Sequence, residues 1–299
     1  MMIGRQAVEV AVHQSGRPEA PQLEVDLVGS HLTVRQEESA RALLERMLGA
    51  HKALKPFYSL ARRDPRLEPL VEEFRGLKPP QFPTVLEAVA NGIACQQLSL
   101  LVGILLLSRL AHLTGVMSAN ATDAAHAFPD AADLAGVKAL SLKSLGFSGN
   151  KSQALLDISS AVRDRRLNLE SLRQLDNQLA LERLVRLRGV GRWTAEYVLL
   201  RGLGRLDIFP GDDVGARNKL AQFLCKKKPL DYKGVHRAVA GWQPYAGFVY
   251  FHLLLARIQK AGWLCSHHAH CAASQDFMLV PYRKGDESNL SSQGKDQTS

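Results

Sequence analysis

Cysteine is scarce in this chain, with four residues among 299, at Cys95, Cys225, Cys265 and Cys271. Their positions follow no framework spacing. A chain of this length with 46% hydrophobic content buries a core large enough to fold without disulfides. The sequence therefore excludes a disulfide scaffold and predicts a reducing, cytoplasmic compartment.

Long apolar runs are missing as well. The longest, around residues 100–107, is far shorter than the roughly 20 residues that cross a bilayer as a helix. Residues 1–16 contain no apolar segment typical of a secretory signal. We therefore expect a protein that is neither secreted nor embedded in a membrane, and a monomer by default.

Acidic residues are outnumbered by basic ones, 29 to 38, which gives a formal net charge of +9. Positive charge attracts polyanions, because neutralising phosphates releases their counterions. Many basic proteins never bind nucleic acid, so the charge favours such a partner without establishing it.

The order of patterns along the chain predicts a small β layer followed by helices. Stretches 7–12 and 23–34 are typical of antiparallel strands. Apolar residues then recur at helical spacing from residue 37, and a long helix is expected over 84–113. Other expected helices begin near Thr122 or Asp123 and cover 151–163, 181–188, 192–203, 212–224, 232–240 and 244–261.

Two short motifs carry the chemistry. Gly189-Val190-Gly191 joins two helical patterns, and a tight glycine turn before a helix exposes amides that bind phosphate. A helix C-cap in an ordinary helical hairpin is the alternative. The pair Asp212-Asp213 opens a later helix, where acids usually cap. The helix dipole and the free amides hold a carboxylate ionised at that position.

Together these motifs resemble the helix-hairpin-helix (HhH-GPD) DNA glycosylase superfamily, whose hallmark is this hairpin followed by a Gly/Pro-rich loop and an aspartate. Residues 187–220 match that unit. The runs 191–197, 210–213 and 93–99 resemble its DNA-3-methyladenine glycosylase II branch. The resemblance covers roughly residues 80–262.

The resemblance implies a mainly α fold with a small N-terminal antiparallel β layer and two helical subdomains around a cleft. Residues 1–36 would form the β layer. One subdomain, carrying the catalytic aspartate, would combine 37–85 with 205–275, and the other, carrying the hairpin, would cover 86–204. Residues 276–299 would be a largely disordered tail.

The resemblance also implies a DNA repair enzyme of base excision that acts on double-stranded DNA containing damaged bases. Asp213 would be catalytic, while Asp212 would cap or orient. Bifunctional members form a Schiff base through a lysine where this chain has Trp193, and Arg192 stays protonated and cannot replace it. We therefore expect a monofunctional enzyme that flips an alkylated purine of the 3-methyladenine type and leaves an abasic site.

An aromatic slot would hold the base, because alkylation leaves a purine cationic. The resemblance places Trp193 and Tyr245 in this slot, with Phe248 or Trp242 lining it and Gln96 supporting the pocket or the backbone. Aromatic residues at helical spacing in a core are the alternative.

The remaining expectations concern DNA contacts. Gln97 would be the wedge that fills the vacated stack, and Lys151 would contact a phosphate. For the two glutamines the alternative is a satisfied core amide, and for Lys151 a solvated side chain. The hairpin would contact DNA through Gly189, Val190, Gly191 and Thr194.

No cofactor is expected, and a monovalent cation at the hairpin is left open. Cys265 and Cys271 are two thiols where iron–sulfur members of the superfamily have four. The run 265–271 also carries three histidines, which raises zinc binding, but its spacing matches no common zinc motif and a solvated cluster explains it as well.

Two other functions remain open. A glycosylase of the same fold could act on oxidised or mismatched bases and have lyase activity. Trp193 and the missing cluster cysteines argue against this function. A non-enzymatic helix-hairpin-helix DNA-binding module would gain nothing from the Asp213 carboxylate facing DNA.

Overall fold

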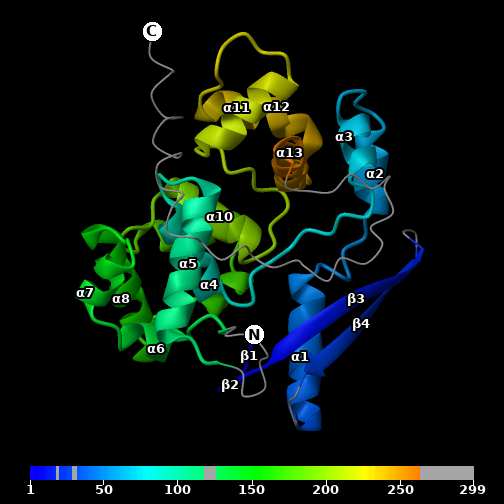
Figure 1. Cartoon of the computed structure of the whole chain (residues 1–299). Coiled ribbons are helices and arrows are strands. Elements are labelled where there is room, and N and C mark those ends of the chain that lie inside the picture. The colour runs from blue at the N-terminus through cyan, green and yellow to red at the C-terminus, as the bar shows by residue number, and fades with distance from the viewer. Residues whose placement is uncertain (18–19, 29–31, 118–125, 263–299) are drawn as a thin grey trace. The chain divides into compact units, whose positions relative to one another are not determined.

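The N-terminal segment is a β layer packed on one helix. Strands β1 (Met2–Ile3) and β2 (Gln6–Ala7) pair antiparallel, and β3 (Glu9–Arg17) pairs with β4 (Ala20–Val28). In the computed structural model, which describes residues 1–17, 20–28, 32–117 and 126–262, the β3–β4 hairpin runs beside α1 (Val34–Met47) (Figure 1).

The second predicted strand, which was expected to reach residue 34, is shorter in the structure, and α1 begins at that residue. The strand ends at Val28, and Thr33 caps the helix three residues earlier than predicted. Thr33 and Gln36 form a capping box, in which each side chain bonds the backbone of the other. The β-branched residues at 33 and 34 had read as strand, but the capping pair decides the local structure.

The predicted long helix over 84–113 is two helices, α4 (Val85–Cys95) and α5 (Leu100–Thr114). Ser99 caps α5 by accepting a hydrogen bond from the amide of Val102, and Gln97 adopts a left-handed φ of 56° in the break. A Cβ at Gly103 would overlap Cys95 Sγ, so this glycine lets α5 pack closely on the end of α4. Apolar residues on both sides of the turn had hidden it from the sequence pattern.

The remaining helices lie before α4 and after α5. Before α4 come α2 (Lys55–Ala61) and α3 (Leu67–Glu73), which the sequence reading missed. After α5 come α6 (Ala131–Ala135), α7 (Ala139–Ser144), α8 (Gly149–Arg163), the 3-10 turn η1 (Glu170–Gln174), α9 (Asn177–Val185), α10 (Arg192–Arg201), α11 (Val214–Phe223), α12 (Tyr232–Val239), the 3-10 turn η2 (Ala240–Trp242) and α13 (Ala246–Lys260).

Two large apolar cores lie within residues 1–257. The first gathers buried residues from α4 to α10, and the second combines α2 and α3 with residues of α11 to α13. Leu199 belongs to the first core and its neighbour Leu200 to the second, so α10 contributes to both. A third, small core joins Ile3 and Val8 of the β layer to Ala40 of α1. The subdomain boundaries given above remain a proposal.

Several predicted features lie outside the described residues: the caps at Thr122 or Asp123, the run 265–271 with Cys265 and Cys271, and the tail 276–299. Within the described ranges no helix is both long and apolar enough to span a membrane.

Candidate active site

Gly189 and Gly191 play different structural parts in the turn between α9 and α10. Gly189 has a left-handed φ of 74°, and a Cβ there would lie 2.6 Å from the Cβ of Ala154. A Cβ at Gly191 would meet nothing within 4 Å, and this residue caps α10 without a side-chain hydrogen bond. Packing therefore requires glycine only at 189, while the open space at 191 lets another molecule approach the backbone closely.

Gln96 ties this hairpin to the break between α4 and α5. Its Nε2 donates to the carbonyl oxygen of Gly189 and to Oγ1 of Thr194, both at 2.8 Å. The Thr194 side chain is buried, and the amide of Val190 donates to Leu187 within the turn. Thr194 and Val190, which were expected to contact DNA, thus support the hairpin from inside.

Asp213 caps α11 and is held by three donors from separate helices. Its Oδ1 accepts from the amide of Ala216 at 2.8 Å. Its Oδ2 accepts from Trp193 Nε1 at 3.3 Å and from the Tyr250 hydroxyl at 3.1 Å. Helices α10, α11 and α13 therefore converge on one carboxylate, whose orientation is fixed by directional hydrogen bonds.

Trp193 is also part of an aromatic pair. Its ring stacks on that of Tyr197, with centroids 5.6 Å apart and planes 25° from parallel. The Tyr197 hydroxyl donates to Asn91 Oδ1 at 2.7 Å, and burial raises the pKa of Tyr197 to about 12. Burial and the Asp213 carboxylate likewise raise the pKa of Tyr250, so both phenols stay neutral near pH 7.

Tyr197 and Tyr250 were missed by the sequence reading. Tyr197 lies four residues after Trp193 on α10, and this spacing places two side chains on one face of a helix, so the signal was present. Tyr250 offered no such signal, because its contact with Asp213 depends on how α13 packs against α11.

Comparison with known proteins finds relatives in sequence and in fold. The chain is 28% identical over 204 residues to the DNA-3-methyladenine glycosylase of Bacillus subtilis strain 168, over 67% of each chain. The 3-methyladenine DNA glycosylase of Archaeoglobus fulgidus matches with a TM-score of 0.74 and 24% identity, over 89% of this chain and 87% of the other. For the Clostridium acetobutylicum 8-oxoguanine glycosylase/lyase bound to double-stranded DNA the TM-score is 0.71, at 15% identity over 87% and 84%. No family model matches the chain.

The chain belongs to the helix-hairpin-helix DNA glycosylase superfamily. Its mainly helical fold with a small antiparallel strand region is the fold of these glycosylases, as expected from the sequence.

One of the aromatic residues expected in the base slot lies in the core instead. Phe248 is 1% exposed and packs on Phe57, with ring centroids 4.5 Å apart. Tyr245 is half-buried, with its ring centroid 5.5 Å from that of Phe57, and its place in the slot stays a prediction. Phe248 and Trp242 are therefore buried core residues, which was the alternative interpretation of these aromatic side chains. The residue of α13 that contacts Asp213 is Tyr250, two residues beyond Phe248.

Lys151 is occupied inside the protein. Its Nζ donates to the carbonyl oxygens of Ala94 at 2.9 Å and Gln96 at 2.7 Å, at the end of α4, and burial lowers its pKa. A cation on the last carbonyls of a helix stabilises that end. In the structure Lys151 thus supports the 96–99 turn, and its phosphate contact stays a prediction.

Gln97, the predicted wedge residue, lies in the turn between α4 and α5. It is exposed in this turn, with Leu98 exposed beside it. Its left-handed backbone turns the chain between two helices that are fixed by Lys151 and Ser99.

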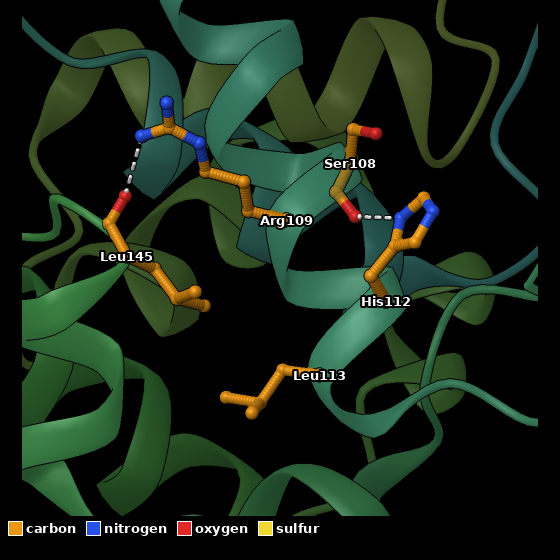
Figure 2. Close-up of a pocket in the computed structure, with 5 residues that line it drawn as sticks. All are labelled: Ser108, Arg109, His112, Leu113 and Leu145. Carbon is orange, nitrogen blue, oxygen red and sulfur yellow. Dashed lines mark hydrogen bonds between the residues drawn. The ribbon is translucent and has the colours of Figure 1, made fainter.

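A shallow groove on α5 is separate from this site (Figure 2). It is lined by Ser108, Arg109, His112, Leu113 and Leu145. Arg109 donates to the carbonyl oxygen of Leu145, and the His112 ring bonds the carbonyl oxygen of Ser108. Among the described residues no three His, Cys, Asp or Glu side chains are grouped as metal ligands would be.

Proposed function

We propose that this chain is a monofunctional DNA glycosylase of base excision repair. It hydrolyses the N-glycosidic bond of flipped-out alkylated purines of the 3-methyladenine type in double-stranded DNA. The observation that carries the proposal is the Asp213 carboxylate, held by Trp193 and Tyr250 beside the hairpin that binds DNA in this superfamily. The sequence relative named for 3-methyladenine supports the choice of lesion.

The chemistry needs little beyond a fixed negative charge. An alkylated purine is cationic, and it leaves as a neutral base by taking the electrons of the glycosidic bond. Asp213 stabilises the positive charge that develops on the sugar and accepts the proton of the water that attacks C1′. The face of Trp193, stacked on Tyr197, offers the cationic base an aromatic surface.

Flipping requires that the vacated space in the duplex be filled. Gln97 is exposed between two supported helices, and we assign it the wedge role, with its amide facing the orphaned base. The backbone at Gly191 and the start of α10 approach a phosphate. Monomeric action and the absence of a cofactor, apart from a monovalent cation at the hairpin, belong to the same proposal.

The test compares the wild type with Asp213→Asn on duplex DNA treated with a methylating agent. We expect the wild type to release methylated purines and leave strands that break only in alkali, and Asp213→Asn to be slower by about two orders of magnitude. Asp212→Asn is the matched control and should retain the wild-type rate, since Asp213 and not Asp212 caps α11. Equal DNA binding without base release by any of the proteins would instead support a DNA-binding module.

A lyase acting on oxidised bases is the second candidate, because the 8-oxoguanine glycosylase/lyase has the same fold. Trp193, with its indole on Asp213, stands where a Schiff-base lysine would have to be. Strand breakage without alkali would favour this candidate.

A further inference from the structure

Glu196 is a buried carboxylate directly behind the loop that carries Asp213. It is 2% exposed and lies on α10, three residues after Trp193. Its Oε2 accepts from the amide of Gly211 at 2.9 Å, and its Oε1 accepts from the Tyr232 hydroxyl at 2.6 Å. Because burying a carboxylate is unfavourable without compensating hydrogen bonds, this position calls for a reason.

Helix capping does not supply that reason. Asp213 itself caps α11, and Asp231 caps α12 by accepting from the amide of Gly234. Glu196 instead bonds a loop amide and the first residue of α12, Tyr232. Burial raises the pKa of Glu196, while the two hydrogen bonds favour its ionised form.

The loop above Glu196 has little freedom to move. A Cβ at Gly211 would lie 2.8 Å from the Tyr232 ring, so the loop backbone packs directly on that ring. The amide of Asp213 donates to the carbonyl oxygen of Pro210 at 3.1 Å, which closes a turn over residues 210–213. Through this turn, the position of Gly211 sets the position of Asp213.

We propose that Glu196 is a positioning residue for Asp213: with Tyr232 it holds the 210–212 loop at the depth that brings the carboxylate to Trp193 and Tyr250. This inference rests on the proposed function. Trp193 and Glu196 occupy one helix, so α10 supplies both the donor to Asp213 and the anchor of its loop.

The same network reaches the DNA-facing end of α10. The Arg192 guanidinium lies over the Tyr232 ring, 4.6 Å from its centroid, and Arg192 is the exposed first residue of the helix. The hairpin and the loop of Asp213 are therefore connected through Tyr232, and Glu196 fixes that connection from the buried side.

The experiment measures single-turnover release of a methylated purine and affinity for abasic-site duplex DNA. Glu196→Ala should slow release by about 100-fold, since a displacement near 1 Å of a catalytic group has that effect, with unchanged affinity for abasic DNA. Glu196→Gln should restore most of the rate. In this variant the side-chain amide oxygen accepts from the backbone amide of Gly211. The side-chain N–H donates to the Tyr232 hydroxyl, which rotates to accept it. Glu37→Ala, an exposed glutamate of α1, is the control.

A second background separates positioning from general structure. In Asp213→Asn, Glu196→Ala should cause no further loss, because its effect passes through Asp213. Equal losses in both backgrounds, or a wild-type rate for Glu196→Ala, would overturn the proposal. If Glu196→Ala does not fold by circular dichroism, Tyr232→Phe, which removes one of the two bonds, should show a partial loss that again vanishes in Asp213→Asn. A wild type that releases no base would overturn the proposed function itself.

Discussion

At the scale of single residues, the site depends on neutral donors that share one carboxylate oxygen. Trp193 and Tyr250 both donate to Asp213 Oδ2, while Oδ1 is occupied by the amide of Ala216. Neither donor can lose its proton near neutral pH, since burial and Asp213 raise the pKa of the Tyr250 phenol. The orientation of Asp213 is therefore fixed without a competing charge.

Tyr250→Phe tests this orientation directly. The variant keeps the buried ring but removes a hydrogen bond to a charged group, which contributes about 1.5–3 kcal/mol. We expect single-turnover base release to fall by roughly 10-fold to 100-fold, with DNA affinity unchanged. Tyr58→Phe, which removes a hydroxyl that accepts from the amide of Gly76, is the matched control. Equal rates for both variants would show that Tyr250 does not orient Asp213.

At the scale of elements, two separate turns and the start of α8 are fixed to one another. Gln96, in the turn between α4 and α5, bonds the hairpin at Gly189 and Thr194, and Lys151 on α8 bonds the same turn. Gln97, to which we assign the wedge role, and the hairpin thus form one connected unit, which would keep the proposed base-flipping and phosphate-binding parts in register.

The two hairpin glycines allow this unit to be dissected. Gly189→Ala places a Cβ 2.6 Å from that of Ala154 at a left-handed φ, so we expect a loss of stability of about 1–3 kcal/mol by chemical denaturation. Gly191→Ala meets open space and should leave stability unchanged, yet weaken duplex binding by standing between the backbone and a phosphate. Unchanged DNA affinity for a folded Gly191→Ala would contradict the proposed contact.

How much the sequence predicted differs between elements. The hairpin, Asp213 and Trp193 were found because each belongs to a local motif with its own spacing. The break between α4 and α5 was missed, because Gln96 and Gln97 lie between two apolar runs that read as one helix. The bonds of Lys151 to the end of α4 were missed, since nothing local shows that these carbonyl oxygens lie within its reach.

At the scale of the whole molecule, a buried histidine links stability to pH. His252 is 1% exposed, surrounded by the rings of Phe57, Phe74 and Phe248, and its Nδ1 bonds the carbonyl oxygen of Phe248 at 2.9 Å. Burial lowers the pKa of His252 to about 4, against about 6.5 in an unfolded chain. The folded state thus holds this ring neutral where the unfolded state would protonate it.

The sign of the effect follows from this difference. The stability that His252 contributes is complete above pH 6.5 and is lost as pH falls towards 4, by about 3 kcal/mol. We expect His252→Phe to show a shallower loss of stability over this range, measured by urea unfolding at successive pH values. Burial raises the pKa of Glu87 to about 7, so this residue changes stability with pH in the opposite direction. Because Glu87 is present in both the wild type and His252→Phe, the difference between their stability curves isolates the effect of His252. Parallel stability curves would refute the assignment.

The sequence by itself determined the family, the hairpin, the carboxylate and the indole beside it, because these depend on residue types at fixed short spacings. Only the tertiary structure decided which aromatic residue of α13 contacts Asp213, and that Gln96, Lys151 and Glu196 act as internal supports. Those contacts join residues far apart in the chain. Helical spacing fixes the faces of each helix but not which face of one helix meets another, and the packing of the two large cores settles that choice.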